Sequence, residues 1–154
     1  MDLNERLKIA EDPSTSPKVL AKLSLDENYY VRAAIAENSS TSPKVLAKLS
    51  LDESAYIRII IVANPSTSLE TLAKLSLDES TFVRMIVAIN PSTPTEVLTK
   101  LSLDEDHYVR EDVARNPSTP LEAIMEMLIK DEGVIKWAKN NSNPEIKRVF
   151  DELR

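Results

Sequence analysis

The six-residue sequence Lys-Leu-Ser-Leu-Asp-Glu occurs four times without change, starting at Lys22, Lys48, Lys74 and Lys100. Each copy therefore begins 26 residues after the previous one. A fixed period of this length is the signature of a repeat architecture, in which each unit buries its apolar face against its neighbours. The chain has one glycine and nine prolines. Because hairpin turns depend on glycine, this composition favours helices over strands.

Counting each unit from the residue after a recurring Asn or Asp divides the chain into parts that together form one repeat domain. We expect an N-terminal half-unit that acts as a cap, four full units, a degenerate unit and a C-terminal capping helix. Their ranges are 1–12; 13–38, 39–64, 65–90 and 91–116; 117–143; and 144–154.

The unit 91–116 shows the expected local structure most clearly. Thr93, Pro94 and Glu96 form a capping box with proline at the first helical position, so a short helix is predicted to begin here. The pattern leaves open whether this helix is α or 3₁₀. Asp104 is predicted to cap a second helix, which ends before Pro117 because proline disfavours a helical residue in front of it.

Two helices this short are marginal alone, so stacking must join their apolar faces into one core. We expect three leucines per unit to form the spine of this core. They are Leu20, Leu23, Leu25; Leu46, Leu49, Leu51; Leu72, Leu75, Leu77; and Leu98, Leu101, Leu103.

The ends depart from the pattern as caps do. Arg6 and Asp12 fall in the columns of Arg32 and Asn38. The degenerate unit aligns Lys139 and Asn140 with Val113 and Ala114, and its Trp137 is interpreted as packing. The final helix is expected to turn four apolar residues inward, namely Ile146, Val149, Phe150 and Leu153.

The string Asn90-Pro91-Ser92-Thr93-Pro94, followed by Val97-Leu98, Leu101, Asp104, Val109-Arg110 and Val113-Ala114, resembles the leucine-rich repeat variant family. The second half of each unit also resembles HEAT repeats, which share an Asp followed six residues later by an Arg. The resemblance implies an all-α fold, a right-handed α-α superhelix (solenoid) of 26-residue two-helix repeats. It also implies scaffolding and binding rather than one chemistry. The cluster-binding cysteines of the variant family have no counterpart here.

Composition excludes several classes of function. The net charge of −6 disfavours nucleic-acid binding, and no apolar run is long enough to span a membrane. The chain has no cysteine and no visible secretory signal, which predicts a cytoplasmic protein. His107 is the only histidine and has no partner constellation. We therefore predict no catalytic residue, no metal site and no cofactor.

The constant polar columns are interpreted as framework. The pairs Asp26/Arg32, Asp52/Arg58, Asp78/Arg84 and Asp104/Arg110 predict an ion-pair ladder. The Asn column is interpreted as a turn device whose amides satisfy backbone groups between units. The four lysines of the repeated sequence are expected on a solvated face, and the four serines are expected to belong to the framework.

The variable columns carry the prediction of a site. The same face of the second helix reads Ala33-Ala34, Ile59-Ile60, Met85-Ile86 and Glu111-Asp112 in successive units. Stacking geometry alone does not require this change. We predict a partner-binding surface formed by Ile59, Ile60, Ala63, Met85, Ile86, Ile89, Asp112 and Arg115. The alternative is that these side chains pack between the helices as additional core.

These features predict a non-catalytic scaffold that binds a protein or peptide through the face of its second helices. The alternative is a homo-oligomerising structural protein, for example a homodimer formed through the same residues. The verbatim hexapeptides are also typical of an engineered or recently duplicated array with no dedicated ligand.

Overall fold

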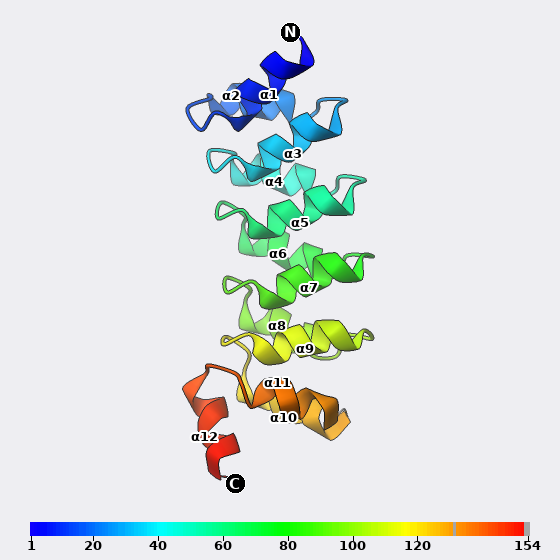
Figure 1. Cartoon of the computed structure of the whole chain (residues 1–154), viewed down its shortest axis with the longest axis vertical. Coiled ribbons are helices and arrows are strands. Elements are labelled where there is room, and N and C mark those ends of the chain that lie inside the picture. Colours follow the sequence, from blue (N-terminus) through cyan, green and yellow to red (C-terminus); the bar gives the residue numbers. More distant parts are fainter. Residues whose placement is uncertain (131, 153–154) are drawn as a thin grey trace. The chain divides into compact units, whose positions relative to one another are not determined.

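The computed structural model describes residues 1–130 and 132–152, and all regular secondary structure in this part of the chain is helical (Figure 1). The helices group into two compact units, residues 1–75 and 76–154. The all-α, helical-repeat class predicted from the sequence is confirmed. The division into 26-residue repeats of a single domain stays a prediction.

The N-terminal unit contains six helices of two alternating kinds. Nine-residue helices α1 (Leu3–Glu11), α3 (Tyr29–Glu37) and α5 (Ala55–Ala63) alternate with seven-residue helices α2 (Pro17–Leu23), α4 (Pro43–Leu49) and α6 (Leu69–Leu75). Within this unit α3 packs between α1 and α5, and each short helix contacts the long helix that precedes it, while α2 and α4 also contact the long helix that follows. The short first helices are α-helical, which answers the question that the sequence left open.

The C-terminal unit continues with α7 (Thr81–Ile89), α8 (Thr95–Leu101) and α9 (His107–Arg115). It ends with α10 (Leu121–Lys130), the 3₁₀ turn η1 (Glu132–Val134), α11 (Ile135–Ala138) and α12 (Pro144–Glu152). Here α9 packs against α7 and α11, so the long helices again lie side by side (Figure 1). None of the helices in the described residues is long and apolar enough to cross a lipid bilayer.

The predicted capping box at Thr93 is wrong. Helix α8 begins at Thr95 with Pro94 as its N-cap, and Thr93 lies outside the helix. The Thr93 hydroxyl is buried and donates a hydrogen bond of 2.6 Å to the carbonyl oxygen of Val87. Threonines at the same column make the same contact to a carbonyl six residues earlier, namely Thr15, Thr41, Thr67 and Thr119. The hydroxyl therefore satisfies the end of the preceding helix instead of the start of the next one.

The predicted cap at Asp104 is also displaced by two residues. The side chain of Asp106 accepts a hydrogen bond from the backbone N–H of Tyr108 and caps α9, while Asp104 accepts from the backbone N–H of Asp106. Asn28 caps α3 in the same way and Asp26 again precedes it. The repeated Asp thus shapes the turn before the cap, which leaves its second oxygen for the ion-pair ladder.

Two of the three predicted core leucines in each unit are buried and the third is not. Leu20 and Leu23 have relative exposures of 0% and 5%, whereas that of Leu25 is 77%. The equivalent residues are also exposed, namely Leu51, Leu77 and Leu103. Leu25 lies outside α2, which ends at Leu23, in the turn that leads to the next helix. The third leucine therefore points away from the core, and its prediction as core is wrong.

In the degenerate unit the recurring asparagine comes 25 residues after Asn116, one residue fewer than the period of 26. Asn141 occupies the place of Asn116, because its amide bonds the same pair of carbonyl groups one helix pair further on. Lys139 and Asn140 are exposed, so their alignment with the buried Val113 and Ala114 is wrong. In α12 Ile146 and Phe150 are buried as expected, Val149 is half-buried, and Leu153 lies outside the described residues.

Candidate functional site

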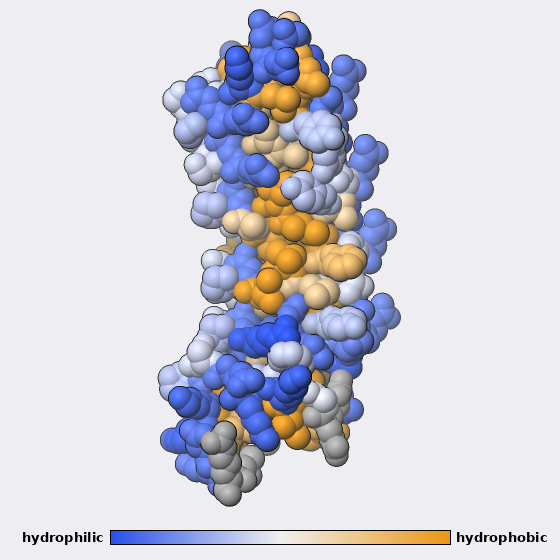
Figure 2. All heavy atoms as spheres, viewed as in Figure 1, coloured by the Kyte–Doolittle hydropathy of each residue, from blue (hydrophilic) through white to orange (hydrophobic). Residues whose placement is uncertain are grey.

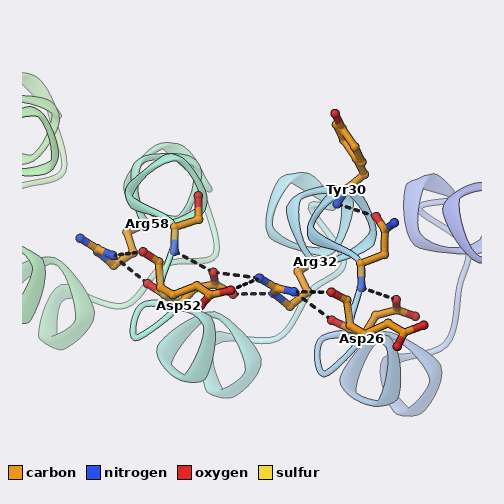
Figure 3. A network of polar contacts seen from close by, with 9 residues as sticks. Asp26, Tyr30, Arg32, Asp52 and Arg58 are labelled. Carbon is orange, nitrogen blue, oxygen red and sulfur yellow. Dashed lines mark hydrogen bonds and ion pairs between the residues drawn. The ribbon is translucent and has the colours of Figure 1, made fainter.

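The most regular polar feature is an ion-pair ladder in which an arginine of one helix pair binds an aspartate of the next, as Figure 3 shows for Arg32 and Asp52. Arg32 on α3 donates from Nε and Nη2 to the Asp52 carboxylate, at 2.7 and 3.3 Å. Its Nη1 donates to the backbone carbonyls of Asp26 and Glu27. Arg84 and Asp104 repeat this arrangement in the C-terminal unit, and Arg6 pairs with Asp26 at 2.9 Å. The guanidinium groups are thus engaged internally, which confirms the predicted framework role. The predicted partners are wrong for Arg32 and Arg84, which bind the carboxylate of the next unit and only the backbone carbonyl of the aspartate in their own.

The ladder also changes the acidity of its members. Burial by itself would raise the pKa of Asp52, but hydrogen bonds from Arg32 and from the Ser54 N–H, with the charges of Arg32 and Arg58, outweigh it. The pKa of Asp52 therefore lies below its ordinary value, and the same balance lowers the pKa of Asp104. The hydrogen bond to Asp52 raises the pKa of Arg32. Both groups stay charged at neutral pH, as a structural ion pair requires.

A second column, formed by asparagines, connects the ends of the long helices. The Asn64 side-chain amide is buried and donates to the carbonyls of Ala36 and Asn38, at 2.6 and 3.3 Å. Its oxygen accepts from the backbone N–H of Ser66. Asn38, Asn116 and Asn141 make the same contacts. The predicted turn device that satisfies backbone groups of the preceding unit is confirmed.

The remaining constant residues are also framework or solvent-exposed. Ser24, Ser50 and Ser102 are buried, and each hydroxyl donates to the carbonyl three residues earlier. The repeated lysines are exposed, as predicted. His107 is exposed as well and stacks on Tyr108 with ring centroids 3.8 Å apart. Within the described residues no group of three His, Cys, Asp or Glu side chains is placed to hold a metal ion.

The predicted partner-binding residues of the N-terminal unit lie together on α5. Ile59 and Ile60 are half-buried and Ala63 is exposed, while Ile57 and Ile61 on the same helix are fully buried. The core therefore takes one stripe of α5, and the predicted residues form the adjoining stripe at its edge. Tyr56, 54% exposed, adds an aromatic ring to this side of the helix.

The equivalent residues of the C-terminal unit lie together on α7. Met85 and Ile86 are half-buried, and Ile89 is 48% exposed. Phe82, in the column of Tyr56, is 70% exposed. Figure 2 shows apolar side chains at the surface of the long helices in both units. The side chains of these variable columns are thus partly exposed to water, and no described residue covers this apolar surface.

The two charged residues of the predicted surface lie on α9, which packs against α7. Arg115 is exposed, whereas Asp112 is buried. The Asp112 side chain is buried and accepts a hydrogen bond of 2.6 Å from Nη1 of Arg115. The guanidinium carbon of Arg115 lies 3.7 Å from the centroid of the Trp137 ring. These residues form a carboxylate–guanidinium–aromatic cluster at this end of the chain.

The sequence did not predict this cluster. Trp137 was interpreted as packing, and its distance of 22 residues from Arg115 is not the period of the repeat. Trp137 reaches Arg115 because α11, in the shortened degenerate unit, packs against α9. Burial raises the pKa of Asp112 above its ordinary value, because the hydrogen bond from Arg115 offsets only part of the cost of removing the carboxylate from water.

No model of a known protein family matches the sequence, and no curated protein matches it either. Among solved structures, the chain is similar to one described as a leucine-rich repeat variant with a novel repetitive protein structural motif. The similarity has a TM-score of 0.71 at 25% sequence identity and covers 89% of this chain and 55% of the other. The chain thus spans little more than half the length of that protein. The predicted resemblance is confirmed: in fold, this chain is a helical-repeat protein similar to the leucine-rich repeat variant.

Proposed function

We propose that the chain is a non-catalytic scaffold that binds a protein or peptide through the face of its long helices. A helical-repeat fold agrees with a scaffold rather than an enzyme. The absence of cysteine from the sequence supports a place in the reducing cytoplasm. The net charge of −6 argues against a nucleic-acid partner.

One observation carries the proposal: the exposed apolar side chains of the long helices change from pair to pair while the framework does not. The Leu, Asn, Thr and Asp columns repeat because each fills the same structural role in each pair. The column of Ile60 and Ile86 holds Ala34 earlier in the chain and Asp112 later. A residue needed for stacking would be constant, so this variation supports a surface that serves something outside the fold.

The cost of exposure supports the same conclusion. Apolar area in water costs roughly 25 cal/mol per Å². Isoleucine at the half-exposed positions 59, 60, 86 and 89 is therefore an unfavourable choice for a surface without a partner. A partner segment with apolar side chains would remove this area from water.

The test is a selection of peptides from a random display library on the immobilised full chain. Peptides that bind the wild-type chain should lose binding to the variants Ile60→Asp, Ile86→Asp and Ile89→Asp. The matched controls are Leu51→Asp and Leu77→Asp, which place the same charge on exposed leucines of the turns. Thermal unfolding of the Ile89 variant should match the wild type, since that side chain is 48% exposed. Equal loss of binding in both sets of variants would contradict the proposal.

The same apolar stripes favour one alternative, self-association of the chain as a homodimer with a structural role. Light scattering distinguishes it. A monomer at high micromolar concentration agrees with a separate partner, whereas a dimer that dissociates in the Ile86→Asp variant would replace the proposal.

A further inference from the structure

A shallow pocket lies on the long-helix side of the N-terminal unit and includes Tyr56, but none of the isoleucines discussed above lines it. Its lining comes from three neighbouring long helices: Glu11 from α1, Tyr29, Tyr30, Ala33, Ala34 and Glu37 from α3, and Tyr56 from α5. The pocket therefore combines three phenol rings, two carboxylates and two methyl groups, and none of its lining residues is basic.

The hollow exists because alanines replace larger side chains. Ala33 and Ala34 occupy the columns that hold Ile59 and Ile60 in the next pair. Both alanines are 8% exposed and are the most buried residues of the lining, so they form its base. The rings stand around them: Tyr29 lies edge-on to Tyr30 with centroids 5.2 Å apart and is tilted against Tyr56 at 6.1 Å.

The two carboxylates give the pocket a negative charge. Glu11 and Glu37 are exposed and end successive long helices in the same column. Neither carboxylate forms a hydrogen bond or an ion pair with any residue in the described part of the chain. Lys8, three residues before Glu11 on α1, is exposed and does not line the pocket. The faces of the tyrosine rings add the negative side of their quadrupoles.

The C-terminal unit shows which group binds to a combination of aromatic ring and carboxylate. Arg115 occupies the column of Glu37, and its guanidinium lies over the Trp137 ring while it donates to the Asp112 carboxylate. Aromatic face, carboxylate and guanidinium are thus assembled there from one chain. The N-terminal pocket supplies the aromatic rings and the carboxylates without the cation.

We propose that the N-terminal pocket binds an arginine side chain of a peptide or protein partner. A planar guanidinium can stack on a tyrosine ring and donate to Glu11 or Glu37 at its edge, whereas an ammonium group has no plane to stack. Free arginine is the weaker ligand, because its own carboxylate would lie close to the two glutamates, and an amide-linked arginine carries no such charge. The proposal deepens the proposed function by naming the chemistry of the partner, but it depends on different residues.

The test uses the full chain and small amide-blocked probes, followed through the methyl signals of Ala33 and Ala34 in NMR titrations. N-acetyl-arginine-methylamide should shift both signals in a saturable way, while the citrulline analogue, which has the same shape without the charge, should not. The lysine analogue and free arginine should bind more weakly than the arginine probe. Raising the salt concentration should weaken binding, since the glutamates are exposed.

Variants separate the pocket from non-specific attraction. Glu11→Gln and Glu37→Gln should each weaken the arginine probe by about fivefold, the most that an exposed ion pair gives, and the double variant should weaken it further. The matched control is Glu96→Gln on α8, an exposed glutamate outside the pocket, which should leave binding unchanged. Tyr56→Leu should weaken binding while the thermal unfolding temperature stays close to that of the wild type, because this ring is 54% exposed.

Equal shifts with arginine and citrulline, equal binding of lysine, or an effect of Glu96→Gln as large as that of Glu37→Gln would overturn the proposal. The variants Ile86→Asp and Ile89→Asp distinguish it from the proposed function. They should leave binding of the arginine probe unchanged. A variant that no longer binds the library peptides but still binds the arginine probe therefore reports on the apolar surface alone. Retained library peptides without arginine binding would overturn only the pocket.

Discussion

The Nε atom of Arg32 lies 2.7 Å from the carboxylate of Asp52, a residue of the next helix pair. The same guanidinium holds the backbone carbonyls of Asp26 and Glu27 at the start of its own pair. One side chain thus joins the turn of one pair to the turn of the next. In a repeat protein, stability is a sum of unit terms and nearest-neighbour terms. The ladder, together with the leucine core and the asparagine column, supplies the nearest-neighbour terms.

Replacing Asp52 by asparagine should lower the free energy of unfolding at pH 7 by about 3 kcal/mol, because Arg32 is left without its carboxylate in a largely buried place. The lowered pKa of Asp52 gives the sign of the pH dependence. Its stabilisation is present above the unfolded value of about 3.9 and is lost as the pH falls through the native value. Urea unfolding followed by circular dichroism should therefore show the difference between variant and wild type shrinking below about pH 4.

Glu53 provides the control for this prediction. Its carboxylate lies 3.5 Å from Nη2 of Arg32 but its side chain is 89% exposed. Glu53→Gln should change stability by less than about 0.5 kcal/mol. An effect as large as that of Asp52→Asn would mean that net charge, rather than the ladder, governs the acid transition.

Asparagine and aspartate should not be interchangeable in the middle of the second column. In Asn64→Asp a carboxylate oxygen would face the carbonyl oxygens of Ala36 and Asn38, which now accept from the amide. We expect a loss of about 3 kcal/mol or more at pH 7, measured by urea unfolding.

The first member of the column explains the choice of control. Asp12 is exposed, and within the described residues its side chain makes no contact of the kind that the Asn64 amide makes to two backbone carbonyls. Its carboxylate instead accepts from the N–H and hydroxyl of Ser14, which lowers its pKa. Asp12→Asn should leave the unfolding midpoint nearly unchanged. A similar loss at both positions would contradict the assignment of the column to contacts between pairs.

The repeat predicted the paired helices and the polar columns, because constant residues at a fixed period report constant contacts. It did not predict which leucines are core. Leu23 and Leu25 are equally constant, yet the first is buried and the second exposed. Periodicity identifies a column without stating which side of the backbone it faces. The same limit explains the error at Thr93, whose hydroxyl serves the preceding helix rather than the following one.

This distinction leads to a third prediction, on Leu49 and Leu51. Leu49→Ala should cost about 2–4 kcal/mol, since the buried side chain leaves a cavity. Leu51→Ala should stay within about 0.5 kcal/mol, since 82% of its surface is already in water. Thermal unfolding of the two variants side by side gives the comparison. A large loss from Leu51→Ala would indicate that the exposed leucines are covered by another chain in solution.

The candidate surfaces were harder to predict for a physical reason. The sequence showed that the columns of Ile60 and Glu37 vary, which indicated where a partner could bind. It did not show that Ala33 and Ala34 leave a hollow bounded by rings from two helices, because this depends on side chains 23 to 27 residues apart, such as Tyr29 and Tyr56. It also placed Asp112 on the partner-binding surface, whereas the side chain of Asp112 is buried beside Arg115.

Asp112 should be a destabilising residue at neutral pH. Burial raises its pKa, so between the unfolded value of about 3.9 and the native value the folded chain binds more protons than the unfolded chain. Stability contributed at this site therefore falls as the pH rises through that interval. Asp112→Asn, which keeps an acceptor for Arg115 without the charge, should increase the free energy of unfolding at pH 7 by up to about 1 kcal/mol and change nothing at pH 3. The exposed Asp151 on α12 serves as control, and Asp151→Asn should show no such pH-dependent gain. A variant less stable than the wild type at pH 7 would show instead that the charge of Asp112 holds Arg115 against Trp137 strongly enough to outweigh its burial.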